Sequence, residues 1–247
     1  LGGGVTAISS ENSVNHSNPA TYTSFKANSF LFSTGGMHKT TNIQNSTDNQ
    51  IANNSSFSHL TVAFPISRKL GASAGMLPYS NIGYTLNARN SDANADMIYS
   101  GDGGLSKIYF GGAYEPFKGF ALGINASYLF GALNRRKQLV YDDESFFNAR
   151  SNSKINLKGY FYELGIMYKK ILSVEKVISF GLTANNNSSI SAKRTNLVET
   201  FSSVSEVTDI AINTSEQGDA TLPQYISTGI SYRDGKKWLL VADYSMQ

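Results

Sequence analysis

The stretch FALGINASYLFG, residues 120–131, decides the fold of this 247-residue chain. Its large apolar side chains recur at every second position, and small or polar side chains occupy most of the positions between them. This period of two predicts a β-strand with two chemically different faces. One face holds Phe120, Leu122, Ile124, Ala126, Tyr128 and Phe130, and the other holds Ala121, Gly123, Asn125, Ser127 and Gly131.

The same alternation recurs along the chain, for example in residues 60–66, 178–184 and 238–244. It predicts an all-β protein of about nine strands, preceded by a Gly-, Ser- and Asn-rich segment, residues 1–26, that has no sustained period. The predicted strands are 27–43, 56–67, 70–88, 104–116, 119–140, 153–171, 176–195, 222–233 and 237–247.

Alternation alone does not say which face points inward, so a soluble sandwich and a membrane barrel both remain open. The connections favour the barrel, because short turns near 67–69, 117–119, 172–175 and 234–236 alternate with long polar stretches near 44–55, 89–103, 141–152 and 196–221. Outer-membrane barrels have this asymmetry between their two ends. We therefore predict a transmembrane antiparallel up-and-down β-barrel, with these side chains facing lipid: Leu122, Ile124, Phe180, Leu182, Leu240 and Ala242.

Composition agrees with this class and excludes others. Tyr and Phe, at 14 each, dominate the large side chains, as in the aromatic girdles of barrels. The net charge of +3 is spread along the chain, so nucleic acid is not an expected partner. Single-chain bacterial barrels have even strand numbers, so nine strands predict an incomplete barrel that continues beyond residue 247.

Several short motifs resemble the FadL/OmpP1/TodX family of outer-membrane transporters, in the branch typical of Bacteroidota. The resemblance is carried by the opening LGGGVTA (residues 1–7), by Asn18-Pro19-Ala20, and by LP (222–223), GISYR (229–233), Trp238 and ADY (242–244). SYLFG (127–131) and LPYSNIGY (77–84) belong to the same set. The resemblance implies a 14-stranded barrel, residues 27–247 being its incomplete part, with residues 1–26 as an N-terminal hatch inside the lumen.

The resemblance also implies a place and an activity. The protein is expected in the bacterial outer membrane, with its N-terminus on the periplasmic side and its long loops extracellular. Members of that family pass long-chain fatty acids or other hydrophobic compounds inward. Asn18, Pro19 and Ala20 would anchor the hatch, although Asn-Pro also begins ordinary loops.

Pro78 interrupts the third predicted strand, where it cannot donate a ladder hydrogen bond. One interpretation is a bulge that only adjusts curvature. The other is a kink that opens a lateral exit in the wall, as the kinked third strand does in the family. The residues predicted at this kink are Gly75, Pro78, Tyr79 and Gly83.

Three functions remain open. The first is transport of a hydrophobic small-molecule ligand, with Leu129, Phe161 and Met167 lining its path by alternation and outer-membrane lipid around the barrel. The second is a structural or docking subunit of a larger outer-membrane secretion or assembly machine, bound to other outer-membrane or surface proteins through the long loops. An outer-membrane enzyme is the third and is disfavoured.

Catalytic and metal chemistry have little support in the sequence. The three histidines are His16, His38 and His59, and no carboxylate forms a visible triad with any of them. Asp92, Asp96 and Asp102 lie in a Gly-rich stretch that lacks the spacing of a calcium loop, so turn chemistry is the simpler interpretation. Without cysteine there are no thiolate ligands, and no cofactor is expected.

Overall fold

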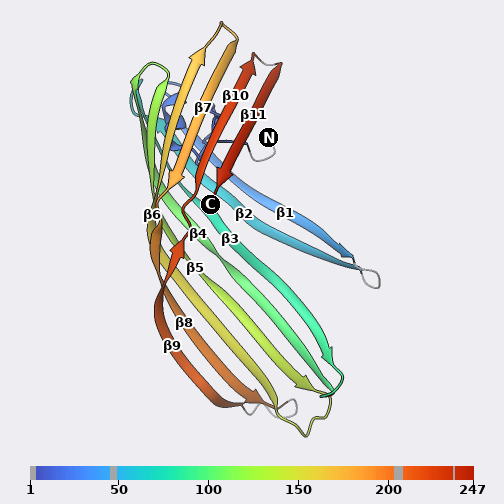
Figure 1. The fold of residues 1–247 in the computed structure, drawn as a ribbon. Coiled ribbons are helices and arrows are strands. Elements are labelled where there is room, and N and C mark those ends of the chain that lie inside the picture. The colour runs from blue at the N-terminus through green and yellow to red at the C-terminus, as the bar shows by residue number, and fades with distance from the viewer. Residues whose placement is uncertain (1–3, 45–48, 203–207, 236) are drawn as a thin grey trace.

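The computed structural model describes residues 4–44, 49–202, 208–235 and 237–247. One antiparallel sheet of eleven strands contains nearly all of the regular structure (Figure 1). A short 3-10 helix, η1 (Pro19–Ser24), precedes it. The strands are β1 (Leu31–Gln44), β2 (Asn49–Pro65), β3 (Leu70–Asn90), β4 (Ala95–Phe117), β5 (Phe120–Tyr141), β6 (Asn148–Ile171), β7 (Lys176–Asn185), β8 (Ser188–Phe201), β9 (Thr208–Leu222), β10 (Ile226–Asp234) and β11 (Trp238–Met246).

The eleven strands make nine passes, as the sequence predicts. β7 and β8 both pair antiparallel with β6, one along each half of it, so they are two segments of one pass. β9 and β10 form the next pass, because β9 pairs with β8 and β10 pairs with β7. The all-β antiparallel class is confirmed. Within the described residues the sheet is not closed, since β1 pairs only with β2 and β11 only with β10.

The predicted long loops are the main error in the local structure. Residues 89–103 and 141–152 mostly continue strands, and the chain turns only at 91–94 and 142–147. The predicted loop 196–221 is largely the β8–β9 hairpin. Polar residues have weak intrinsic strand preference, but a ladder partner on each side overrides it. Of the predicted loop 44–55, residues 45–48 lie outside the described residues.

The short turns lie together at one end of the sheet, which we call the short-turn end (Figure 1). Near this end the apolar face of each strand points outward. On β5, Leu122 and Ile124 are 42% and 47% exposed, whereas the side chain of Asn125 points to the opposite face and is fully buried. All six side chains predicted to face lipid are exposed. The outward apolar residues form a band around this half of the sheet, which we call the apolar band.

The apolar band ends about eleven residues from the short turns. On β3 the outward side chains are apolar up to Pro78 and then become polar, with Asn81, Thr85, Asn87 and Arg89. On β5 the change comes after Phe130 and on β6 beyond Tyr160, at corresponding positions of the ladder. Roughly 9–11 residues are what a tilted strand needs to cross a bilayer, so the band has the height of a membrane.

The strands continue far beyond the band. β6 has 24 residues, which corresponds to about 80 Å of strand. We call the part beyond the band the strand extension; it comprises residues 81–104, 132–158, 188–202 and 208–222 (Figure 1). Here the polarity of the faces is reversed. The inner face carries Ile82, Tyr84, Leu86, Met97, Tyr99, Leu133, Ile155, Val198 and Ile212.

Residues 4–30, which we call the N-terminal segment, lie against the inner face of the apolar band (Figure 1). Glycines let the two backbones approach. A Cβ at Gly123 would lie 2.3 Å from the Pro19 carbonyl carbon, and one at Gly181 would lie 2.1 Å from the Thr6 oxygen. Among the described residues, no helix is long and apolar enough to span a membrane.

Candidate functional site

The inside of the apolar band is packed by the N-terminal segment. Asn18 is fully buried; its Nδ2 donates to the Thr6 carbonyl at 2.7 Å and to the Ile166 carbonyl of β6 at 3.2 Å. Its Oδ1 accepts from the Ala20 amide at 3.1 Å and so caps η1. Asn18, Pro19 and Ala20, the predicted hatch anchors, thus lie where the segment contacts β5 and β6.

The segment also reaches the last strand. The amides of Val5 and Thr6 donate to Asp243 Oδ2 on β11 at 2.7 and 2.8 Å. The Ser231 hydroxyl on β10 donates to the Ala7 carbonyl at 2.8 Å. At the other side, Tyr22 and Phe25 pack with Ala63 of β2, Leu77 of β3 and Tyr109 of β4. The N-terminal segment thus crosses the interior from β11 to β2.

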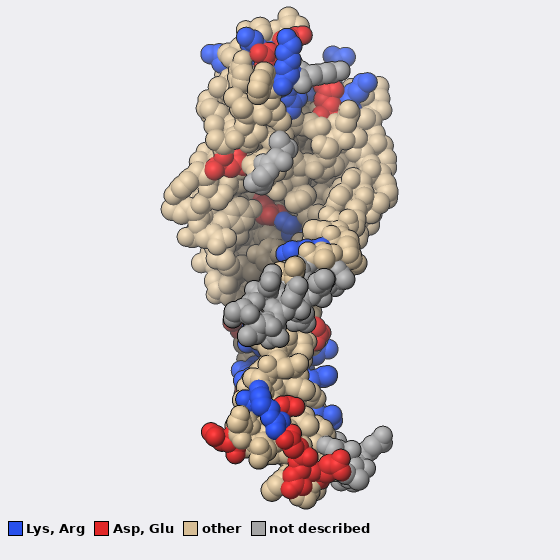
Figure 2. Space-filling view, turned by 90° about the vertical axis from the view of Figure 1, so that its right-hand side faces the viewer, with Lys and Arg blue, Asp and Glu red and all other residues tan. Residues whose placement is uncertain are grey.

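A buried ion pair lies beyond the N-terminal segment. Lys107 Nζ donates to the two carboxylate oxygens of Glu163 at 2.7 and 2.9 Å, and the two side chains are only 10% and 6% exposed. Ser127 donates to the same carboxylate at 3.3 Å, which helps to satisfy it. Figure 2 looks into a hollow that contains side chains of both charges. Neither residue was among the sequence-predicted site residues.

Two groups of the N-terminal segment respond to this environment. Burial, followed by repulsion from Lys107, lowers the pKa of His16 to about 4. Burial, followed by interaction with Tyr109, raises the pKa of Tyr22 above its usual value, although the Asn125 side chain 3.0 Å away opposes the shift. Both groups are therefore neutral at physiological pH. The N-terminal segment packs against the inner face of the apolar band through these polar and apolar contacts, and a cavity of about 630 Å³ lies between it and the strands, lined in part by Ser9, Glu11 and Lys169.

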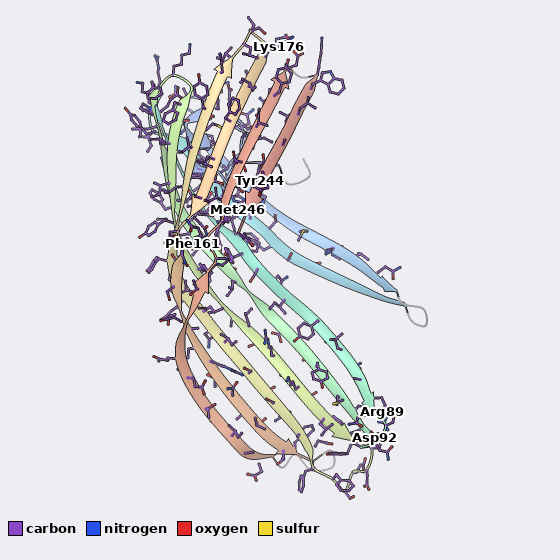
Figure 3. All side chains as sticks on the ribbon, viewed as in Figure 1. Arg89, Asp92, Phe161, Lys176, Tyr244 and Met246 are labelled. Atoms are coloured by element: carbon purple, nitrogen blue, oxygen red, sulfur yellow. The ribbon has the colours of Figure 1, made fainter. Side chains whose placement is uncertain are left out.

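The three predicted ligand-lining residues all point inward. Leu129 and Phe161 belong to a buried apolar cluster that also contains Leu105, Leu157, Ile190 and Leu222. Phe161 lies where the apolar band meets the strand extension (Figure 3). Met167 packs elsewhere, against Ala20 of the N-terminal segment and Ala121. The structure thus brings Leu129 and Phe161 together, whereas Met167 lies under the N-terminal segment.

The predicted kink lies where the wall divides. β2 and β3 pair only as far as Leu60 and Met76, and beyond this point the β1–β2 hairpin leaves the sheet (Figure 1). On its other side β3 stays paired with β4 through Pro78 and Gly83, with a register shift between Pro78 and Ser80. The Tyr79 ring lies 5.9 Å from that of Phe161. Gly75 faces inward, where a Cβ would lie 2.6 Å from the Leu60 carbonyl.

The inner face of the strand extension is exposed. Leu86 is 61% exposed, Ile212 48% and Tyr84 43%, although these side chains share one face of an ordered sheet. A groove of about 340 Å³ lies on this face between β5, β6, β8 and β9. Its lining includes three cationic side chains, Arg135, Lys137 and Arg194.

The far end of the strand extension is acidic (Figure 2). Arg89 forms ion pairs there with Asp96, at 3.0 Å, and with Asp142, whose pKa it holds below the usual value (Figure 3). Asp92 lies in the adjacent turn, whereas Asp102 lies nearer the apolar band, opposite Gly83, and accepts from the Asn134 amide at 2.8 Å. In the described part of the chain no three His, Asp or Glu side chains are arranged to hold a metal.

His59 has hydroxyl partners in the structure. Its Nε2 lies 2.8 Å from the Ser33 hydroxyl and its Nδ1 lies 3.2 Å from that of Ser58. Neighbouring strand residues normally point to opposite faces, but a register shift at Gly35/Gly36 brings Ser58 beside the ring.

A comparison with protein-family models gives one match, to BamG, over residues 2–247. The chain belongs to the BamG family. BamG proteins are associated with the BAM complex, the outer-membrane assembly machinery. No curated protein and no solved structure matches the chain significantly.

Membership of the BamG family corrects the resemblance drawn from short motifs. The expected FadL/OmpP1/TodX membership is wrong, because the BamG match covers almost the whole chain. The motifs are short, at most eight residues each, and the match over residues 2–247 outweighs them. The BamG family is a structural family associated with an assembly complex. Membership implies interaction with other outer-membrane proteins, and lends no support to lipid transport or a small-molecule ligand.

Proposed function

We propose that this protein is a structural subunit of the outer-membrane assembly machinery and that the inner face of the strand extension is its docking surface for another outer-membrane protein. The observation that carries the proposal is the reversal of polarity beyond the apolar band. Leu86 and Tyr84 are exposed on the inner face, whereas their neighbours Thr85 and Asn87 are on the polar outer face. Exposed apolar patches of this kind mark protein interaction sites.

The proposal includes an orientation. In outer-membrane barrels the short turns are periplasmic and the long connections extracellular. The strand extension would then project from the cell surface, where water surrounds it and lipid cannot cover its inner face. A protein partner would bury Leu86, Tyr84 and Ile212 together, as the centre of an interface requires.

The N-terminal segment supports a docking role over a transport role. We propose that it acts as a plug, because the Asn18 anchor and the Asp243 contacts attach it to both sides of the interior. The Lys107–Glu163 pair and the apolar cluster around Phe161 occupy the space beyond it. A passage for a hydrophobic compound would have to displace all three layers.

Site-specific cross-linking tests the proposal. A photoreactive amino acid replaces Leu86 on the inner face, and a matched variant carries it at the neighbouring Asn87 on the outer face. Irradiation of intact cells is expected to give a defined protein adduct from position 86 and none from position 87. Equal adducts from both positions, or adducts from neither, would contradict docking on the inner face.

A further inference from the structure

The groove on the strand extension has a composition that differs from the rest of the inner face. Arg135 and Lys137 lie two residues apart on β5 and therefore point to the same side, and Arg194 reaches the groove from β8. The three cations surround a cavity of about 340 Å³. This is room for a few side chains of a bound chain, not for a folded domain.

The charge of the groove is unbalanced. Among the described residues that line it, three are cationic and none is a carboxylate. The closest acidic residue in the strand register is Glu216, which is opposite Arg194 on β9. Arg194 Nε donates to Asn196 Oδ1 at 3.0 Å and to Ser153 Oγ at 3.3 Å, so neutral groups fix the position of its guanidinium. A guanidinium held in this way can bind a carboxylate from a partner through its remaining donors.

Apolar side chains complete the lining. Ile155, Val198 and Ile212 lie among the cations and Ser151, Ser153, Asn196 and Thr214. A purely anionic ligand such as inorganic phosphate or a phosphorylated glycan would leave these apolar groups in contact with water. A polypeptide that carries both acidic and apolar side chains satisfies both parts of the lining.

We propose that this groove binds an acidic segment of a partner protein, with carboxylates on Arg135, Lys137 and Arg194 and apolar side chains on Ile155, Val198 and Ile212. The inference rests on the docking role proposed above and adds the chemistry of the partner. Electrostatic attraction would guide the segment to the groove, and the apolar contacts would extend the lifetime of the complex.

A binding assay with defined peptides tests the proposal directly. The full-length protein in zwitterionic detergent is titrated with a fluorescent peptide that alternates Glu and Leu. Two peptides of the same length, with Gln or Lys in place of Glu, serve as controls. The Glu peptide is expected to bind on the order of tenfold more tightly than the Gln peptide, and more weakly as salt screens the charges.

Charge-reversal variants locate the site. Arg135→Glu and Arg194→Glu are expected to weaken binding of the Glu peptide by on the order of tenfold each. Arg136→Glu and Lys193→Glu, on the outer face of the same strands, are matched controls expected to change it less than about twofold. All four side chains are exposed, and heat-modifiability on gels confirms that each variant is folded.

The outcomes separate this proposal from the docking role. Equal binding of the Glu and Gln peptides, or equal effects of inner and outer variants, would overturn the acidic segment even if position 86 cross-links. Displacement of the Glu peptide by lipopolysaccharide or inorganic phosphate at equal charge would assign the groove to phosphate groups and also overturn it. If the Glu peptide binds selectively but position 86 gives no cross-links, the acidic-segment proposal is supported and the proposed docking surface around Leu86 is rejected.

Discussion

The apolar band and the strand extension are built from the same strands, yet they place their apolar residues on opposite faces. On β5, Leu122 and Ile124 point outward in the band, whereas Leu133 points inward in the extension, beside the cations of the groove. The switch occurs where β2 leaves β3 and where Gly131 has a φ of 155°. A continuous ladder of backbone hydrogen bonds therefore joins two regions adapted to different surroundings.

The comparison shows that the backbone alone does not reveal the environment of a strand. In the band, lipid would replace water on the outer face, and the N-terminal segment packs against the inner face. In the extension, the outer face is polar, and the inner face carries exposed apolar side chains together with the three cations of the groove. The first region has both faces covered by its own chain or by the membrane, and the second has one face that requires a partner. The following tests address this difference, from the largest expected effect to the smallest.

Removing one member of the buried ion pair should have the largest effect on stability. Lys107→Met leaves the Glu163 carboxylate unpaired inside the band, which should lower the free energy of unfolding by about 3–5 kcal/mol. Arg89→Gln, which breaks the exposed pairs at the end of the extension, should lower it by less than about 1 kcal/mol. Urea unfolding in lipid vesicles measures both. Similar losses of stability in the two variants would contradict the distinction between a packed inner face in the apolar band and an exposed one in the strand extension.

The double variant Lys107→Met/Glu163→Leu is the control for that comparison. Replacing a whole buried pair with apolar side chains is often neutral, so the double variant should recover most of the stability lost by Lys107→Met. A double variant as unstable as the single one would mean that the pair has a packing role that charge does not explain.

An outward charge should distinguish the two regions next. Ile124→Arg, near the middle of the apolar band, should destabilise the protein by roughly 2–4 kcal/mol, because the guanidinium would enter the hydrocarbon. Asn134→Arg, on the same face of β5 in the extension, should change stability by less than about 0.5 kcal/mol. Unfolding in vesicles gives both values, and equal costs would contradict the membrane boundary placed between them.

Low pH should destabilise the interior of the band through His16. Its pKa is about 4 in the folded protein, whereas an unperturbed histidine has a pKa of 6.5, so the unfolded state binds more protons between these values. The contribution is complete above pH 6.5 and is lost as pH falls through this window, by about 1–3 kcal/mol in total. His16→Gln should lack this component. Lys107, Glu163 and His59 also act on the ring, so only the difference between wild type and variant is informative.

The smallest effect on stability is expected at the docking surface. Leu86→Asp should change the free energy of unfolding by less than about 0.5 kcal/mol, because the side chain is already 61% exposed. It should nevertheless abolish co-purification with the assembly machinery from native membranes, whereas Asn87→Asp should preserve it. Loss of co-purification in both variants would argue against a role specific to the inner face.

Much of the fold follows from local pattern. Alternation over 120–131 and in the related stretches determines the strands, and the asymmetry of the short turns determines the up-and-down order. The strand extension was missed because its residues are polar on one face and mixed on the other, as in 89–103 and 196–221. A polar sequence becomes a strand when neighbouring strands supply its ladder, and this information is not local.

The site was less predictable for a similar reason. The motif Asn18-Pro19-Ala20 is visible in the sequence, and its role as a hatch anchor stays a prediction, but the contacts with Ile166 and Gly123 are identified only by the folded structure. Lys107 and Glu163 are 56 residues apart, and neither stands out alone. One signal was present, because each occupies an inward position by alternation, where a charge requires a partner. The family assignment was wrong because it rested on short motifs, whereas the BamG match covers residues 2–247.

The contact between Val5 and Asp243 has a consequence for the order of folding. It joins residues that are 238 positions apart, so two distant parts of the chain must come together before this contact can form. Such nonlocal contacts form late, because loop-closure entropy is lost before they contribute any stabilisation. The N-terminal segment therefore completes its packing only after β11 has paired with β10. A folding intermediate in which β11 has not yet paired lacks the Asp243 carboxylate that binds the amides of Val5 and Thr6. Proteases added during refolding should therefore cleave such an intermediate within the N-terminal segment.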